Sequence, residues 1–339
     1  MINYLYWNQV SLGQIWKYAI IIVPTQNDWR LNLVKNSWLN TEQRFKGRMI
    51  GKLLGDGCIT IQRNRKPRFQ FIHAASDLCW SKYCYRHLQS HIPLNPPKLK
   101  KVIDPRLKAG YSLSYYTQSR TSNVITYLRS EWYPNSIKII PFESIYKHFT
   151  VESLAWWYMD DGHLKRDKNK PQKIILSTDN FTRKENQQLI HFLYERFHLL
   201  FRLDKQNRLI IYDQYQIFYF LYLVTPFLHA SMHRKALQNC SLRFSAASRR
   251  TTIYLPENLA LTSPTKEINK ALSSGLKLIK TDFKNGNFYK KYRPIIWAKR
   301  TQTKPYQIVI NSLNLENLHF LKSATGLEFS VLSSMCFLN

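Results

Sequence analysis

An internal repetition constrains the fold of this chain more than any other feature of its sequence. Residues 49–57 read MIGKLLGDG and residues 154–162 read LAWWYMDDG, so both are apolar segments that close on Asp-Gly. Each is followed, in the same order, by a basic loop with a proline, a β-type segment, a helical segment, a second β-type segment and an amphipathic helix. Because a repeated order of elements indicates a repeated structure, we expect two related halves.

Each half is predicted to contain strands and helices at matching places. In the first half we expect strands at residues 69–72 and 111–117 and helices at residues 78–91 and 122–132. In the second half we expect strands at residues 174–178 and 208–212 and helices at residues 183–199 and 214–224. Phe69 and Phe71 alternate with polar neighbours, as in a strand with one buried face. The prediction is an α+β fold in two copies.

The two Asp-Gly ends suggest the chemistry of the repeat. Asp56 and Asp161 are each predicted at the C-terminal end of a helix, where the helix dipole is already negative. Gly57 and Gly162 are expected in the left-handed conformation that ends a helix. If Gly51 lets the two helices approach closely, both carboxylates meet, and a hard divalent ion such as Mg²⁺ or Mn²⁺ relieves their repulsion. Such an ion is typical of phosphodiester cleavage.

Charge and cysteine usage indicate the class of partner and the compartment. The chain has 50 Lys and Arg against 21 Asp and Glu, a net charge of +29 that a polyanion such as nucleic acid would neutralise. The apolar run at residues 18–23 is too short to cross a bilayer, so we expect no membrane partner. The five cysteines form no C-x-x-C pair, which predicts free thiols in a reducing compartment.

The paired segments resemble the signature helices of the LAGLIDADG homing endonucleases, in the single-chain type that carries two motifs. The resemblance covers residues 46–245. It implies a pseudo-twofold αββαββα duplication, with two saddle-shaped antiparallel sheets that straddle DNA and a helical interface between the halves. It further implies a monomer that cuts both strands of a specific DNA site with a divalent metal ion and leaves 3′ overhangs. Because introns of organelles, phages and archaea encode such proteins, an organelle is one expected location.

The resemblance also assigns metal-binding roles within the two motifs. Asp56 and Asp161 correspond to the acidic metal ligands of the family, and the main-chain carbonyls of Gly55 and Asp160 would complete the site. The side chain of Asp160 is interpreted either as a support for the ligands or as a solvent-facing group. The second motif departs from the family at Trp156, where glycine is common. Its close helix contact is therefore expected from a neighbouring alanine or from an asymmetric fit.

Two lysines extend the resemblance beyond the motifs. Residues 133–141 are similar to the family segment Y-P-x-x-x-K-x-x-P, and residues 232–237 are its counterpart in the second half. In the family a lysine at each place lies near the scissile phosphate, which implies catalytic roles for Lys138 and Lys235. A lysine there could polarise the attacking water or stabilise charge in the transition state.

Basic and polar residues of the loops and strands are the predicted DNA contacts, because phosphate contacts position a protein and base contacts specify the sequence. The loop residues expected to hold phosphates are Arg63, Arg65, Lys66, Lys165, Arg166, Lys168 and Lys170. The strand residues expected in the major groove are Arg68, Gln70, Lys173 and Arg208.

Four segments are predicted along the chain. They are an N-terminal extension (1–45), the first half (46–142), the second half (143–245) and a basic C-terminal extension (246–339). The last is interpreted either as a solvated, partly helical segment or as a source of further nucleic-acid contacts. Its candidate aromatic residues for stacking on RNA are Phe283, Phe288, Tyr289 and Tyr292.

The predicted function is a site-specific double-strand DNA endonuclease. The alternative is an RNA-binding intron splicing maturase on the same scaffold, with or without cleavage, because composition does not separate DNA from RNA. The presence of both acids and both lysines favours cleavage. Residues 158–161 also read YMDD, the metal-binding turn of reverse transcriptases. Thr150 can cap a helix that runs through this segment, which argues against a hairpin turn there.

Overall fold

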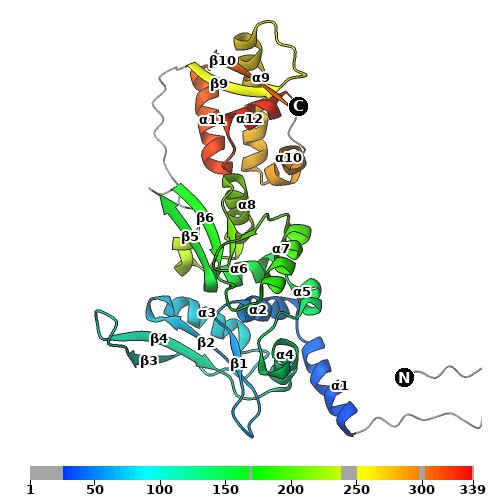
Figure 1. The fold of residues 1–339 in the computed structure, drawn as a ribbon, viewed down its shortest axis with the longest axis vertical. Coiled ribbons are helices and arrows are strands. Elements are labelled where there is room, and N and C mark those ends of the chain that lie inside the picture. The colour runs from blue at the N-terminus through cyan, green and yellow to red at the C-terminus, as the bar shows by residue number, and fades with distance from the viewer. Residues whose placement is uncertain (1–25, 168–169, 238–249, 298–301, 338–339) are drawn as a thin grey trace, which may run out of the picture.

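The computed structural model describes residues 26–167, 170–237, 250–297 and 302–337, and within them two units of the same αββαββα order (Figure 1). The first unit consists of α2 (Gln43–Leu54), β1 (Cys58–Thr60), β2 (Arg68–Ala74), α3 (Leu78–Leu88), β3 (Lys98–Ile103), β4 (Tyr111–Gln118) and α4 (Asn123–Trp132). The second consists of α6 (Val151–Asp161), β5 (Gly162–Asp167), β6 (Lys170–Leu176), α7 (Arg183–Phe197), β7 (Arg202–Leu203), β8 (Leu209–Ile211) and α8 (Gln214–Val224).

The two sheets have the same topology. Their strand orders are β1-β2-β4-β3 and β5-β6-β8-β7, and every pair of neighbours is antiparallel. Figure 1 shows both sheets on one side of the molecule, with α2 and α6 between the two halves. The predicted α+β duplication is therefore confirmed. Among the described residues, no helix is long and apolar enough to span a membrane.

Each sheet buries one face and leaves the other for a partner. In β2, Phe69 and Phe71 are buried, whereas Arg68 and Gln70 lie on the opposite face. Gln70 pairs with Gln118 across the ladder, and residues that pair directly point to the same face of an antiparallel sheet. In the second sheet, Lys165 pairs with Lys173 in the same way. The outer faces of both sheets thus carry polar and basic residues, with Ile72 exposed among them in β2.

Close packing of α2 on α6 brings the halves together, and it depends on glycines of α2. A β-carbon on Gly51 would lie 2.4 Å from the main-chain oxygen of Ser153 and 2.9 Å from Cβ of Trp156. Trp156 itself is fully buried. The contact is therefore asymmetric: α2 supplies the small residues and α6 the large ones. Of the two expectations for Trp156, the asymmetric fit is the one observed.

The predicted left-handed conformation of Gly57 and Gly162 is wrong. Gly162 has φ −82° and ψ 145°, and the φ of Gly57 also lies outside the left-handed region. Both positions need glycine because of close approach. A β-carbon on Gly57 would lie 2.5 Å from the main-chain oxygen of Lys52, and one on Gly162 would lie 2.3 Å from that of Tyr158.

Two further helices pack against helices of the duplicated core. α1 (Gln26–Leu39) lies against α4, where Trp38 is buried and stacks on Tyr127 with 6.1 Å between ring centroids. α5 (Phe142–His148) joins the two halves and contacts α2. The described cysteines are free thiols, namely Cys58, Cys79, Cys84 and Cys336. Cys240 lies outside the described residues.

The described part of the C-terminal extension is a packed unit. It contains β9 (Arg250–Pro256), α9 (Pro264–Lys284), α10 (Phe288–Trp297), β10 (Thr303–Val309), α11 (Ser312–Thr325) and α12 (Phe329–Cys336), with β9 and β10 antiparallel. Figure 1 shows it stacked on α8 at one end of the molecule. Tyr222 donates a hydrogen bond to the carbonyl of Gly286 at 3.1 Å, and Arg293 donates one to the hydroxyl of Tyr219 at 3.2 Å.

The four aromatic residues predicted to stack on RNA are not exposed. Phe288, Tyr289 and Tyr292 have exposed fractions of 1%, 4% and 0%, and Phe283 packs against the core. Tyr289 lies 5.0 Å from the ring of Tyr219 in α8. Their interpretation as RNA-stacking residues is therefore wrong, because they form the apolar interior of the unit and its contact with the second half.

Candidate metal and nucleic-acid site

The C-terminal ends of α2 and α6 meet at the centre of the molecule and carry three aspartates. Asp161 is the last residue of α6, and Asp56 follows the end of α2. Thr150 caps α6 by accepting from the amide of Ser153. The YMDD segment is therefore the end of a helix, as predicted, and not a hairpin turn.

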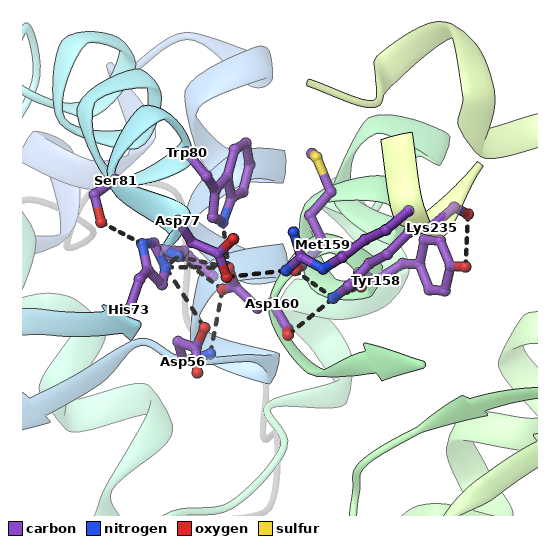
Figure 2. Close-up of polar contacts among 11 residues, drawn as sticks. Asp56, His73, Asp77, Trp80, Ser81, Tyr158, Met159, Asp160 and Lys235 are labelled. Atoms are coloured by element: carbon purple, nitrogen blue, oxygen red, sulfur yellow. Dashed lines mark hydrogen bonds and ion pairs between the residues drawn. The ribbon is translucent and has the colours of Figure 1, made fainter. Parts of the chain in front are cut away.

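The side chain of Asp160 is the buried centre of this region (Figure 2). Its carboxylate is fully buried and accepts from Lys52 Nζ at 2.7 and 2.8 Å. It also accepts from Trp80 Nε1 at 2.8 Å and from the amide of Asp56 at 3.2 Å. Burial alone would raise the pKa of Asp160, but Lys52 and His73 hold it well below the ordinary value. The solvent-facing interpretation of this side chain is therefore wrong.

His73 closes the network on the side of Asp56. Its Nε2 lies 2.7 Å from Lys52 Nζ and 3.5 Å from Asp56 Oδ2, and its Nδ1 lies 2.6 Å from the hydroxyl of Ser81. Burial, followed by the charge of Lys52, lowers the pKa of His73. We therefore assign it as neutral, with Nε2 accepting from Lys52 and Nδ1 donating to Ser81.

Asp56 and Asp161 differ from Asp160 because each lacks a full set of partners. Burial raises the pKa of Asp56 to about 8, and the charges of Asp160 and Asp161 add to the shift. Burial raises the pKa of Asp161 to about 6, with a further contribution from Asp160. The side chain of Asp56 keeps 32% of its surface exposed. Two carboxylates whose charge is disfavoured in this way are suited to hold a divalent cation.

A second group of ligand atoms lies close by but is a poorer cation site. Asp56, His73 and Asp160 each place one ligand atom within 4.8 Å of the others. The ammonium of Lys52 already occupies the inner side of this group, because it contacts both His73 and Asp160. A divalent ion there would face that positive charge at short range, so a cation on the exposed side of Asp56 is favoured electrostatically.

The two predicted lysines contact the ends of the motif segments. Lys138 donates to the carbonyl of Gly57 at 3.2 Å. Lys235, in the turn Ala230–Lys235, donates to the carbonyls of Tyr158, Met159 and Asp160 at 3.0, 2.6 and 3.2 Å (Figure 2). The main-chain oxygen of Asp160 therefore already accepts a hydrogen bond from Lys235.

Burial shifts the pKa of both lysines in the same direction. It lowers the pKa of Lys235 to about 8 and also lowers the pKa of Lys138. A lysine with a lowered pKa gives up a proton more readily near neutral pH, and while charged it can stabilise a developing anion. Gly55, the other predicted carbonyl ligand, caps α2 and donates its amide to the carbonyl of Gly51 at 3.1 Å.

The predicted DNA contacts fall into exposed and internally bonded residues. The exposed ones are Arg63, Arg65, Lys66, Lys165 and Lys170. The predicted loop location of Lys165, Arg166 and Lys170 is wrong, because Lys165 and Arg166 lie in β5 and Lys170 begins β6. Arg68, Gln70 and Lys173 are half-buried on the outer faces of the sheets, whereas Lys168 lies outside the described residues. Arg166 donates to the carbonyl of Ala236, and Arg208 forms an ion pair with Asp204 at 2.7 Å. These two arginines therefore already interact with other groups of the protein.

Lys52, His73 and Trp80 are the residues of this site that sequence reasoning missed. A lysine inside an otherwise apolar motif was a usable signal, because a buried lysine needs a buried acid. The identity of that acid was not readable, since Lys52 and Asp160 come from different halves. His73 and Trp80 carried no spacing that set them apart from structural residues.

The chain belongs to the LAGLIDADG DNA endonuclease family. The family model matches residues 46–221, just over half of the chain. An uncharacterized protein of Methanocaldococcus jannaschii is 30% identical over 207 residues, which are 58% of this chain and 74% of the relative. A probable intron-encoded endonuclease 1 of Wickerhamomyces canadensis is 29% identical over 227 residues, 60% of this chain and 89% of the relative.

Two further matches bear on the fold and on the range of the family. A cytochrome b mRNA maturase bI2 of Debaryomyces hansenii is 27% identical over 172 residues, 50% of this chain and 63% of the relative. The solved structure of the homing endonuclease I-WcaI bound to its DNA recognition sequence matches with a TM-score of 0.51 and 24% identity. It covers 61% of this chain and 93% of that chain, and it supports the fold.

Proposed function

We propose that this chain is a site-specific endonuclease that hydrolyses both strands of a DNA duplex. The observation that carries the proposal is the close packing of α2 on α6 around glycine, which brings Asp56 and Asp161, two acids with raised pKa values, within electrostatic range of each other. Their hard oxygen atoms fit Mg²⁺ or Mn²⁺, which would polarise the scissile phosphate and activate water when bound. One chain supplies both motifs, so a monomer would suffice.

The two lysines beside the motif segments would act on the substrate directly. Lys138 and Lys235 are held at the carbonyl ends of the motif segments, where each would stabilise negative charge on a phosphate of one strand. A cavity of about 520 Å³ opens beside Lys235 and is lined by His163, Leu164, Lys165, Arg166, Arg234 and Lys235. Its cationic lining fits a backbone phosphate. Cleavage at one phosphate on each strand, with 3′ overhangs, follows from the family assignment.

The outer faces of the sheets are the proposed DNA surface. Exposed residues such as Arg65, in the loop after β1, and Lys170, at the start of β6, would hold phosphates, and Arg68 and Gln70 would read base edges. Replacing Lys170 with Ala should weaken binding to all sequences about equally, whereas Arg68→Ala should relax the preference at one position by about 1–3 kcal/mol. A uniform loss for both variants would contradict this division of contacts.

Selection from a randomised duplex library in Mg²⁺ tests the endonuclease assignment. The wild-type chain is expected to cut a small set of related sequences, and Asp161→Asn is expected to bind them and leave them intact. Cleavage by both proteins, or tight binding with no cleavage by either, would overturn the assignment. A control in excess EDTA separates metal-dependent cleavage from a contaminating nuclease.

RNA binding is a second candidate function, and α9 provides the observation that favours it. Four exposed lysines of α9 lie on one helix face, namely Lys266, Lys270, Lys277 and Lys284. Among the described residues, the ion pair of α9 is that of Asp282 with Lys291, and these four lysines form none. These four lysines lie outside residues 46–221. A basic helix face would suit RNA binding by an mRNA maturase, which is the name of one relative.

Matched variants separate the two surfaces. Replacing the four α9 lysines with Gln should lower RNA affinity and reduce the slope of log affinity against log salt by about 0.7 for each phosphate that is no longer neutralised. Replacing Arg63, Arg65 and Lys66 with Gln should reduce duplex DNA binding instead. If the α9 variant binds structured RNA as the wild type does, RNA recognition by this face is excluded.

A further inference from the structure

We propose that Asp160 is a positioning residue whose carboxylate fixes the main chain of Asp56 and so sets the two metal-binding acids relative to each other. The inference rests on the proposed function of Asp56 and Asp161 as metal ligands. Asp160 belongs to the second half and directly precedes Asp161 in α6. Its Oδ2 accepts from the amide of Asp56, which belongs to the first half, at 3.2 Å. One side chain therefore links the backbones that carry both acids.

The carboxylate of Asp160 is itself held from several sides. Lys52 Nζ contacts both of its oxygens, and Trp80 Nε1 donates to Oδ1 at 2.8 Å. The side chains of Lys52 and Asp160 are both fully buried. Each oxygen thus has two donors, Lys52 and Trp80 at Oδ1 and Lys52 and Asp56 at Oδ2. A group with that many partners in a dry environment has little freedom to move.

The donors of Lys52 are equally committed. The ammonium contacts His73 Nε2 at 2.7 Å in addition to the two oxygens of Asp160, so all three of its hydrogens have an acceptor. The ion pair is therefore complete without solvent or ligand. Buried ion pairs of this kind add little net stability compared with apolar residues, so their value lies in fixing an arrangement.

Gly55 completes the geometry by making room for Asp160. A β-carbon on Gly55 would lie 2.5 Å from Cβ of Asp160 and 2.8 Å from its Oδ2. Cβ of Asp160 cannot move away without moving α6. The backbone at the end of α2 can thus reach the Asp160 carboxylate only because residue 55 is glycine, which places the amide of Asp56 within hydrogen-bonding distance.

Two double variants distinguish positioning from simple stabilisation. Lys52→Met with Asp160→Asn removes the ion pair but keeps an oxygen for the Asp56 amide. The Asn NH2 group then takes the place of Oδ1, where it can donate to His73 but cannot accept from Trp80, a loss that the Leu variant below shares. Lys52→Met with Asp160→Leu removes the ion pair and also the acceptor. Both neutral pairs avoid an unpaired buried charge, so both are expected to fold.

The measurements are thermal unfolding, binding of the selected DNA duplex, Mn²⁺ binding by electron paramagnetic resonance without DNA, and single-turnover cleavage. For the Leu variant we expect unchanged duplex affinity, Mn²⁺ affinity lowered by about tenfold and cleavage lowered by about 100-fold, the range found when groups that orient metal ligands are removed. The Asn variant should stay within about threefold of the wild type in both metal affinity and cleavage rate.

A folded Leu variant that binds Mn²⁺ as tightly as the Asn variant would overturn the proposal. If the Leu variant does not fold, Lys52→Met with Asp160→Ala provides the same test, because alanine also lacks an acceptor. If the wild type binds Mn²⁺ but cuts no duplex, the proposed function fails, while the difference in Mn²⁺ affinity between the two variants still decides the role of Asp160.

Discussion

Three aspartates at the ends of α2 and α6 have different electrostatic environments. Asp160 is matched by Lys52 and keeps its charge, whereas burial disfavours the charge of Asp56 and Asp161. Asp160 is thus engaged in an ion pair within the protein, whereas Asp56 and Asp161 are available to bind a cation. The same division applies to the basic groups, since Lys52 is bound to an acid and Lys235 to carbonyls only.

The raised pKa of Asp56 predicts a pH dependence of stability. Between pH 3.8 and about 8 the folded state retains a proton on Asp56 that the unfolded state releases, so this group makes the metal-free protein less stable as pH rises. Asp161 acts in the same direction up to about pH 6. Histidines such as His73, whose pKa is lowered, act in the opposite direction, so the comparison of variants is the informative quantity.

Urea unfolding in EDTA at about pH 5 and about pH 7 would measure this effect. The loss of stability over this interval should be smaller in Asp56→Asn than in the wild type, by about 2–3 kcal/mol, because one proton is released on unfolding over two pH units at about 1.4 kcal/mol each. The same pH dependence in both proteins would show that Asp56 titrates normally. Addition of Mg²⁺ should remove most of the difference, because metal binding displaces the proton.

Lys235 is predicted to contribute to both cleavage and local structure. Lys235→Met should lower the cleavage rate by about 100-fold, because the donor at the end of α6 and the charge beside the cavity are both removed. Duplex affinity should fall less than tenfold, since Lys235 is one cation among many. Lys235→Arg is the control, and full activity of the Met variant would remove Lys235 from the catalytic group.

At the scale of elements, the contact of α2 with α6 decides where the acids lie. Gly51 faces the backbone of α6, which cannot rotate away, whereas Gly47 faces side-chain hydroxyl groups of Ser153 and Thr150. Two glycines of the same helix are therefore under different constraints. Close helix packing at Gly51 was predicted from the sequence, but the partner surface, with the bulky Trp156 beside Gly51, was not.

Alanine substitutions at the two glycines provide a matched pair. Gly51→Ala should destabilise the fold by about 2–3 kcal/mol through overpacking against Ser153 and Trp156. Gly47→Ala should cost less, because Ser153 Oγ can rotate away at the loss of one hydrogen bond from the amide of Thr150, and alanine favours the helix by about 1 kcal/mol. Equal unfolding midpoints for both variants would contradict the packing described for this interface.

At the scale of the whole molecule, the duplicated core was predictable from the order of elements and the C-terminal unit was not. The repeat of apolar segment, strands and helices sufficed for both halves. The strand β3 was missed because all six of its residues are exposed, so its sequence has no buried face to reveal it. The strand β5 was missed because its basic residues were interpreted as a loop. The interior of residues 250–337 includes Tyr289, which contacts α8, and such long-range contacts leave no local pattern.

Removal of the C-terminal unit should therefore harm the second half. A chain ending at residue 237 would expose Tyr215 and Tyr219 of α8, both of which are buried in the full chain. We expect the unfolding temperature to fall by several degrees, at about 2–4 °C per kcal/mol of stability removed, together with increased aggregation. An unchanged unfolding temperature would show that the unit is only tethered.

The central claim is that Asp56 and Asp161 share a divalent cation while Asp160 is occupied by Lys52. The most direct test is a crystal of the protein with its DNA and Mn²⁺, measured at a wavelength where manganese scatters anomalously. The account predicts an anomalous peak in contact with the carboxylates of Asp56 and Asp161 and the Lys52–Asp160 pair intact. A peak among Asp56, His73 and Asp160, with Lys52 displaced, would contradict it.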